Sequence, residues 1–351
     1  MYPADHCTDF PLVDERWAEC FALDSAFVHA TLFAGASIED YALKQPMSKA
    51  TARHLNETLS RLRTILSSSS GQAIGAASYI VLSLCIVASI YGDGNALNIH
   101  LSGLRRLIAM RGDYHDVFLS PRIMAKMDRL DLSAYICKGL RPPLPIGPFS
   151  WKPVYTSSPG CGQNTMDVYS EAVRDITDVR LLDIFRDLQN LATDIDQCFT
   201  TRSYLHGSRF RASVYSIQSR LLHIEDDSGE LWDELLRLGM LACLSTYFRV
   251  PHRSVSGAYL KDKIRLGFLG IEYPTPEQIN LLLWLLMVSA ISISEPDEHW
   301  LVAEWRFLAP PREISYSQFK HTTLHRLIWV DCLYDEMGQK AFHTLQKHIT
   351  S

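Results

Sequence analysis

The chain has 351 residues, of which 47% are hydrophobic and 21% are charged, and this composition excludes disorder as its main state. The length is enough for one large domain or for two closely packed lobes. A formal net charge of -5 at pH 7 gives no general attraction to nucleic acid or to an acidic membrane, so such contacts would need a local basic patch. The longest basic cluster is the pair Arg105 and Arg106, which is more typical of a solvated helix face.

The N-terminus and the cysteines indicate an intracellular protein. Residues 1–10 carry two aspartates and lack a basic start followed by an apolar run, so we expect no secretory signal peptide. The eight cysteines are scattered, no Cys-x-x-Cys occurs, and the closest two, Cys7 and Cys20, are thirteen positions apart. We expect most of them to be small buried hydrophobes, with Cys85 and Cys243 inside apolar runs. A zinc-cluster DNA-binding module needs closely spaced thiolates, and this sequence has no such segment.

The first long apolar segment, 73–91, reads AIGAASYIVLSLCIVASIY and contains no charged residue. Its length is close to the roughly 20 residues that cross a bilayer, so a transmembrane helix is one interpretation. A glycine, several serines and several alanines dilute the segment, and it stands alone among amphipathic helices. We therefore expect a central helix that is buried on nearly all sides, and we interpret the shorter apolar segment 279–293 in the same way.

Residues 98–112, NIHLSGLRRLIAMRG, are predicted to form an amphipathic helix. Its apolar face is made by residues at helical spacing: Leu97, Leu101, Leu104 and Ile108. Arg105 and Arg106 lie off this face, and Gly112 supplies the left-handed residue that commonly ends a helix.

The next predicted helix starts at Ser120 and Pro121, an N-cap followed by a proline at the first helical position, and it ends at Gly139. A stretch rich in proline and glycine follows and continues to about Met166. This stretch, 141–166, is the only plausible hinge between two helical lobes, within a single domain that covers residues 1–351.

The rest of the chain has a helical pattern. Apolar residues recur every three or four positions in three segments: Leu181, Ile184 or Phe185, Leu188, Leu191, Ile195 and Phe199; Val214, Ile217 and Leu221; and Leu231, Leu235, Leu238, Leu241 and Leu244. Thr275 and Pro276 mark another helix start. Ser317 is expected to cap a last helix, whose apolar residues are Phe319, Leu324, Leu327 and Ile328. No sustained alternation typical of strands occurs, so we predict an all-α fold.

A histidine followed by Gly-Leu and a closing Arg-Gly, as in residues 98–112, resembles the middle homology domain of fungal-specific transcription factors. The segment RLDLSA at 129–134, with a glycine and two prolines after it, is similar to the next helix of that family. Four C-terminal segments also resemble the family, in the order IQSRLL, LWDELLRLGMLACLSTYFR, LLLWLLMVSA and LHRLIWVDCLYDEM. Together they cover most of residues 15–340, and their order carries the resemblance more than any single motif.

The resemblance implies a large all-α regulatory domain in a nuclear protein that regulates a metabolic or secondary-metabolite gene set. In this family the domain normally follows a zinc cluster, which this sequence lacks, so we expect no direct DNA binding. An upstream exon with six closely spaced cysteines would instead make the chain part of an ordinary DNA-binding activator. The implied partners are a second copy of the chain, a full-length zinc-cluster regulator, or a small-molecule effector bound in the helical core.

The charged residues around 98–112 have two interpretations. His100 and Arg111 can line an effector pocket. Alternatively these charges are structural, because Asp128 and Asp131 lie on a following helix that is expected to pack nearby. On this second interpretation we predict that Asp131 pairs with Arg105 or Arg111.

An acidic cluster offers the sharpest indication of an enzyme. Asp226-Asp227-Ser228-Gly229-Glu230 has the DDxxE form, which in all-helical terpene cyclases holds magnesium ions against a substrate diphosphate. Such an enzyme also needs a second metal-binding helix, which we do not find in the sequence. An acidic loop that ends one helix and caps the next through Ser228 explains the same residues, so the terpene cyclase type is the alternative rather than the expected function.

Two further motifs are weaker. His321 and His325 are four positions apart and can lie on one helix face, but Thr322 stands where a metalloprotease carries its glutamate base. Ser317 to Lys320 matches Ser-x-x-Lys without the companion motifs of penicillin-recognising enzymes. The sequence contains neither Gly-x-Gly-x-x-Gly nor a phosphate-binding loop. We therefore expect no catalytic residue, no metal site and no cofactor.

Overall fold

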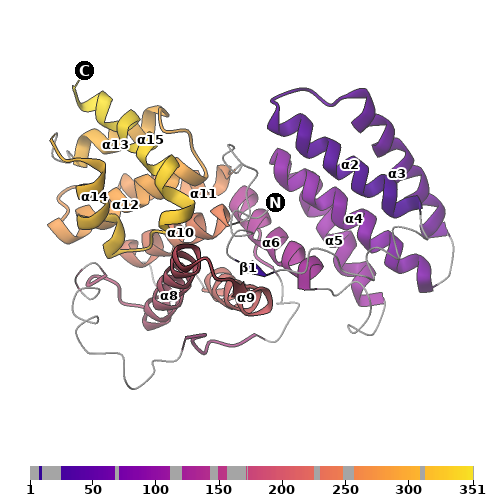
Figure 1. The fold of residues 1–351 in the computed structure, drawn as a ribbon, viewed down its shortest axis with the longest axis horizontal. Helices are drawn as coiled ribbons and strands as arrows, with labels where there is room; N and C mark the ends of the chain where they lie inside the picture. The colour runs from indigo at the N-terminus through magenta and orange to yellow at the C-terminus, as the bar shows by residue number, and fades with distance from the viewer. Residues whose placement is uncertain are drawn as a thin grey trace. The chain divides into compact units, whose positions relative to one another are not determined.

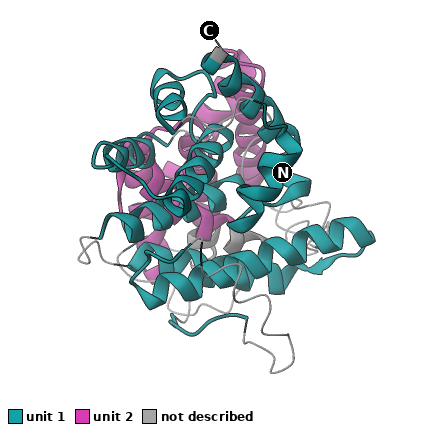
Figure 2. Cartoon of the chain, turned by 90° about the vertical axis from the view of Figure 1, so that its left-hand side faces the viewer, with its two compact units in different colours: residues 1–9, 141–249, 257–351 teal, residues 10–140, 250–256 magenta. Residues whose placement is uncertain are grey.

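The computed structural model describes residues 8–9, 25–67, 71–110, 121–142, 149–155, 171, 173–224, 230–247, 257–308 and 313–350 (Figure 1). Helices make up most of these segments, and the predicted all-α fold is confirmed. The chain divides into two compact units, which are coloured separately in Figure 2. Unit 1 comprises residues 1–9, 141–249 and 257–351, and unit 2 comprises residues 10–140 and 250–256. The division falls at residue 141, where the turn-rich stretch begins, and the single-domain assignment stays a prediction.

Unit 2 is a bundle built around one apolar helix. Its helices are α2 (Ser25–Ala42), α3 (Lys49–Ser67), α4 (Gly71–Tyr91), α5 (Gly94–Met110) and α6 (Pro121–Lys138). The central helix α4 contacts all four of the others, and residues 76–85 are buried without interruption. This arrangement agrees with the expectation of a buried central helix. In the described parts of the chain, none of the helices has the length and apolar character that a membrane span requires.

Helix α5 extends the predicted 98–112 helix at its N-terminal end. The Asp93 carboxylate accepts the Ala96 backbone N–H at 3.0 Å, as an N-cap side chain does, and the helix therefore starts at Gly94. The predicted face needs one correction, because Leu107 is buried and Ile108 is only half-buried. The expected end at Gly112 lies outside the described residues.

Helix α6 matches its predicted bounds. It starts at Pro121 and ends at Lys138, and Gly139 follows with a φ of 69°, the left-handed conformation that glycine adopts without strain. The cap expected from Ser120 lies outside the described residues, as does most of the 141–166 stretch.

Unit 1 packs its helices around α12. The elements are α8 (Val179–Thr201), α9 (Gly207–His223), α10 (Leu231–Thr246), α11 (Ala258–Phe268), α12 (Pro276–Ser292), α13 (His299–Leu308), α14 (Tyr316–Thr322), the short 3-10 helix η4 (Leu324–Arg326) and α15 (Asp331–Thr350). Residues 281–292 are buried without interruption, and α12 contacts α10, α13 and α15. The buried Trp284 indole donates to the Ile328 carbonyl at 2.7 Å, which ties α12 to the segment before α15.

The predicted helix starts in unit 1 are partly correct. Thr275 and Gln278 form a capping box ahead of Pro276, which confirms the start of α12. The cap of α14, however, is Ser315, because its reciprocal partner Gln318 lies three residues further on, so the prediction of Ser317 is wrong. Helix α14 ends at Thr322, and the apolar residues expected to continue it lie in η4 and the segment after it: Leu324, Leu327 and Ile328.

Two other expectations in unit 1 are corrected. Phe199 is 53% exposed, because the buried face of α8 ends at Ile195 while the apolar spacing continues for another turn. The N-cap of α10 is Glu230 rather than Ser228, because the helix starts at Leu231. The apolar faces of α9 and α10 are otherwise buried as predicted, with Leu231 half-buried.

The described residues include one pair of two-residue strands. β1 (Thr8–Asp9) pairs in parallel with β2 (Leu205–His206), and the Asp9 carboxylate accepts the Gly207 backbone N–H at 2.7 Å. This contact binds the N-terminal residues of the chain to the start of α9.

Candidate functional site

Arg105 and Asp131 form an ion pair between α5 and α6 in unit 2. An Arg105 Nη lies 2.5 Å from an Asp131 Oδ, and the side chains are 27% and 12% exposed. The predicted pairing of Asp131 is thereby confirmed for Arg105, while Arg111 lies outside the described residues. The neighbouring Arg106 is exposed, as its position off the apolar face predicts. The Arg105 Nε is buried and has no hydrogen-bond partner, so Asp131 provides much of the compensation for this charge.

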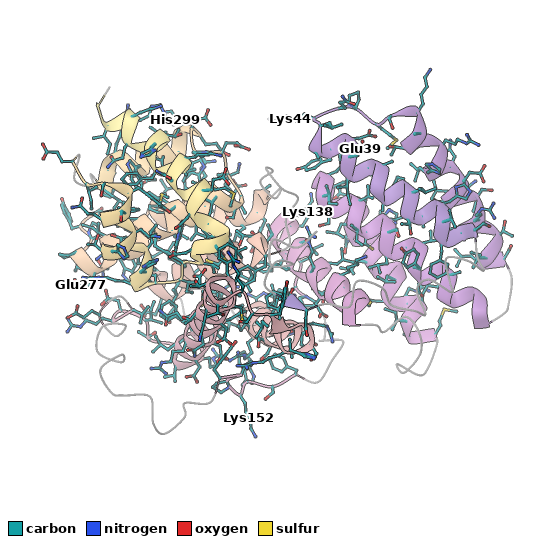
Figure 3. All side chains as sticks on the ribbon, viewed as in Figure 1. Glu39, Lys44, Lys138, Lys152, Glu277 and His299 are labelled. Carbon is teal, nitrogen blue, oxygen red and sulfur yellow. The ribbon has the colours of Figure 1, made fainter. Side chains whose placement is uncertain are left out.

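His100 lies half-buried on α5, one turn before the ion pair. Burial lowers its pKa, although the nearby charge of Asp93 opposes the shift, and the neutral imidazole is favoured. At the start of the same helix, a Cβ on Gly94 would lie 2.5 Å from the Lys138 Cγ, so the Lys138 side chain, labelled in Figure 3, covers this end. The interpretation of His100 and Arg111 as pocket residues stays a prediction.

The described cysteines fit the expectation of small buried hydrophobes. Cys85, Cys137 and Cys243 are buried, and burial raises the pKa of the Cys85 thiol to about 12 and that of Cys137 to about 11. Cys198 and Cys332 are half-buried. A thiol with a raised pKa is protonated at neutral pH and is a poor metal ligand or nucleophile.

The structure describes only part of the predicted enzyme motifs. Asp226 and Asp227 lie outside the described residues, so the terpene cyclase alternative has no described geometry. The His321 and His325 rings touch edge to face with centroids 5.1 Å apart, but α14 ends between them, so they do not share a helix face as predicted. Across the described segments, no group of three potential metal ligands converges.

Unit 1 contains a groove along α8 with a mixed polar and apolar lining, which the sequence did not indicate. This α8 groove has a volume of about 450 Å³ and runs between α8 and the segment that joins η4 to α15. Its lining residues are Gln189, Ala192, Thr193, Asp196, Gln197, Thr200 and Thr201 on α8, and His325, Leu327, Trp329 and Asp331 on the opposite wall.

Two side chains of α8 hold the walls of the groove together. Gln189 donates to the Leu327 carbonyl at 3.0 Å. The Asp196 carboxylate accepts the backbone N–H groups of Asp331 at 2.9 Å and of Cys332 at 3.0 Å, which caps the N-terminus of α15. Burial raises the pKa of Asp196, although these two hydrogen bonds oppose the shift.

Asp331 joins the groove to a charged network beside it. Its carboxylate lies 2.8 Å from His325 Nε2 and 3.2 Å from Lys320 Nζ, and Lys320 also contacts Asp335 at 2.7 Å. Burial would raise the pKa of Asp331, but the hydrogen bond from His325 and the charge of Lys320 outweigh it and lower that pKa. His325 and Lys320 are therefore committed to Asp331 and Asp335.

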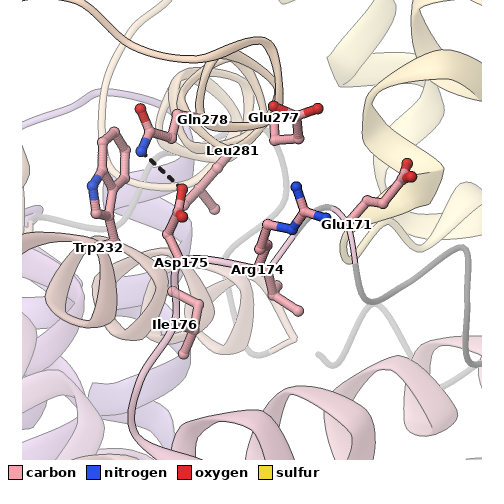
Figure 4. A pocket seen from close by; sticks show the side chains of 9 residues that line it. Glu171, Arg174, Asp175, Ile176, Trp232, Glu277, Gln278 and Leu281 are labelled. Atoms are coloured by element: carbon pink, nitrogen blue, oxygen red, sulfur yellow. Dashed lines mark hydrogen bonds between the residues drawn. The ribbon is translucent and has the colours of Figure 1, made fainter.

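A smaller pocket in unit 1 serves packing. It lies beside the Trp232 ring and has a volume of about 10 Å³, which is about the space that one water molecule needs (Figure 4). Across it, the Gln278 amide donates to the Asp175 carboxylate at 2.8 Å. This contact joins α12 to the turn before α8.

A local signal for one wall of the α8 groove exists in the sequence. Polar residues recur at helical spacing along α8, from Gln189 through Thr193 and Asp196 to Thr200, along one flank of the apolar face. The second wall is more than a hundred residues away in the sequence, and no local pattern connects the two. Comparison with protein-family models, curated proteins and solved structures finds no match to the chain. The resemblance to fungal transcription factors therefore stays a prediction.

Proposed function

We propose that this chain is a transcription regulator-like protein that works without a DNA-binding module of its own. It acts in the nucleus on a metabolic or secondary-metabolite gene set, through contact with another regulator, through a second copy of itself, or through a bound effector. It has no catalytic role.

The observation that carries the proposal is the ion pair between Arg105 and Asp131. These residues lie in the two segments that carry the resemblance most clearly, HLSGLRRLIAM and RLDLSA. The structure places both segments on neighbouring helices, α5 and α6, which pack on the same central helix. This is the arrangement expected if the two segments belong to one helical regulatory domain, and the all-α character of the rest of the chain supports it.

A tethering experiment tests the proposal. The full chain, fused to an unrelated DNA-binding domain, should change transcription of a reporter that carries the matching site. Arg105→Ala should weaken this effect, because it removes the ion pair between α5 and α6. Arg106→Ala is the matched control, since that arginine is exposed on the same helix.

Two further measurements separate the proposal from its rivals. Purified chain should show no tight binding to promoter DNA, whereas affinity that falls steeply with salt would mean that the chain contacts DNA directly. Magnesium-dependent turnover of an isoprenoid diphosphate, lost on replacing Asp226 and Asp227, would instead establish the enzyme. A fusion that leaves the reporter unchanged would contradict the proposed role.

A further inference from the structure

We propose that the α8 groove binds a small organic cation, a molecule that carries an ammonium or guanidinium group. The role of this groove as an effector site depends on the proposed function, whereas the binding of a cation does not. The volume of about 450 Å³ lies within the range of small-molecule pockets. The chemical class follows from the hydrogen-bonding capacity and charge of the lining residues.

The hydroxyl groups of the groove are set up to accept hydrogen bonds. Thr193, Thr200 and Thr201 each donate to a carbonyl one turn earlier in α8, at 3.0, 2.8 and 2.7 Å. A hydroxyl has one proton and two lone pairs, so these donations leave both lone pairs of Thr193 and Thr200 for a ligand. Thr201 keeps one, because its oxygen also accepts the Ser203 hydroxyl at 2.8 Å. A ligand that supplies N–H groups matches this wall.

The carboxylates of the groove add negative charge to the same lining. Asp196 and Asp331 both line it, and no lysine or arginine is among the described lining residues. Lys320 lies behind the lining, 3.2 Å from the Asp331 carboxylate, and offsets part of that charge, so Asp196 is the main candidate to attract a cation. His325, the remaining lining residue that can carry a proton, is already bonded to Asp331. Burial raises the pKa of Asp196, and a cation bound beside it would favour the charged carboxylate. The Trp329 indole in the opposite wall can also contact a cation.

The groove is built on a fixed frame. Gln189 ties α8 to Leu327, and Asp196 ties it to the start of α15. The Trp329 indole donates to Asp335 at 3.0 Å, which fixes the ring in the opposite wall. A ligand would therefore meet preformed acceptors, which lowers the entropic cost of binding.

Calorimetric titration of the purified full chain with 1,4-diaminobutane tests the proposal. The neutral 1,4-butanediol and the anionic succinate have the same four-carbon length and serve as matched probes. We expect the diamine to bind and the other two not to bind at the same concentrations. Affinity should fall as ionic strength rises, because the attraction is electrostatic.

Substitutions at exposed positions test the location of the site with little expected effect on the stability of the fold. Gln197→Lys places a cation in the groove and should weaken diamine binding by about tenfold or more, because like charges repel at close range. Thr200→Val removes one acceptor at nearly constant volume and should weaken it by about two- to fivefold. Gln339→Lys is the control, since it adds the same charge at an exposed site on α15 about 12 Å along the helix from Asp331.

Several outcomes would overturn the proposal. These are diamine affinity unchanged in Gln197→Lys, equal binding of succinate or butanediol, and no diamine binding below about 10 mM. The tethering experiment is independent of these titrations. Binding without reporter activity would leave the site standing and reject the proposed function, and reporter activity without binding would do the reverse.

Discussion

Two ion pairs of this protein differ in how deeply they are buried. Arg220 and Asp187 in unit 1 are both 1% exposed and hydrogen-bonded to each other, and Asp187 also accepts the backbone N–H groups of Val154 and Tyr155. Asp187 therefore holds the 149–155 segment as well as the arginine. The pair of Arg105 and Asp131 in unit 2 is less buried, and each arginine has one buried nitrogen without a hydrogen-bond partner, Nη1 of Arg220 and Nε of Arg105. A guanidinium with an unmet donor is sensitive to the loss of its carboxylate.

Replacing Asp131 with alanine should lower the free energy of unfolding by about 1–3 kcal/mol, because the Arg105 guanidinium loses its ionic partner. The double variant Arg105→Ala/Asp131→Ala should recover part of that loss, since no unpaired charge remains. Urea unfolding followed by circular dichroism measures both changes. Arg106→Ala, at an exposed site, should shift the free energy by less than about 0.5 kcal/mol. Equal stability of Asp131→Ala and the parent chain would show that the pair contributes nothing.

His100 should make the stability of the chain depend on pH below neutrality. Its pKa in the folded chain is lowered by burial below the ordinary value of 6.5. As the pH falls through 6.5, the unfolded chain takes up the proton before the folded chain does, so the folded state loses stability. We expect His100→Gln to flatten this decline between about pH 7 and pH 5. Thermal unfolding midpoints over that range measure the slope, and identical slopes would reject the role of His100.

Helices α10 and α12 pack closely against each other at Gly239. A Cβ at this position would lie 2.4 Å from a Trp284 ring carbon, and Trp284 is itself fully buried. A Cβ at Gly103 on α5 would have no described atom within 4 Å outside its own helix. Both glycines lie inside helices, so replacing each with alanine gives the same gain in helix propensity. A difference in stability between the two variants therefore reports the close packing at Gly239.

Gly239→Ala should destabilise the chain by about 1–2 kcal/mol, because overpacking against Trp284 outweighs the helix propensity of alanine. Gly103→Ala should be neutral or stabilising by up to about 1 kcal/mol. Denaturant midpoints of the two variants, compared with the parent chain, give the test. A stabilised Gly239→Ala variant would show that Trp284 can move aside at little cost.

The elements that the sequence predicts best are those whose signals are local. The apolar face of α8, the cap of α12 and the end of α6 at Gly139 depend on residues within a few turns of each other. The errors occur where neighbouring elements decide the outcome. Phe199 continues the apolar spacing of α8, yet it is exposed because the buried face ends before it. Helix α14 ends at Thr322, although the apolar spacing continues to Ile328, whose carbonyl instead accepts the Trp284 indole N–H.

The candidate sites were also predictable only where their residues are close in the sequence. The pairing of Arg105 with Asp131 was predictable, because both lie on consecutive helices with an opposite charge at a suitable position. The α8 groove was not, because Thr193 and Asp331 come from distant segments that only the packed unit brings together. In the sequence, the α8 wall alone has the pattern of an ordinary solvated helix face.

The two units should unfold as separate cooperative parts, because each has its own buried core. Differential scanning calorimetry of the full chain is therefore expected to resolve two transitions. Asp131→Ala should lower the midpoint of one transition only, and Gly239→Ala should lower only the other. A single transition that both variants shift equally would show that the cores unfold together.

The strand pair of β1 and β2 sets an order for folding during synthesis. Thr8 and Asp9 are translated almost two hundred residues before their partners Leu205 and His206. Residues 10–140 are translated in this interval, so the helices of unit 2 can pack together before β2 is available to pair with β1. The first residues of unit 1 are thus translated before unit 2, but unit 1 can complete its fold only after unit 2 has been translated. An N-terminal fusion or a slowly released leader would interfere with this late closure and leave the helices of unit 2 intact.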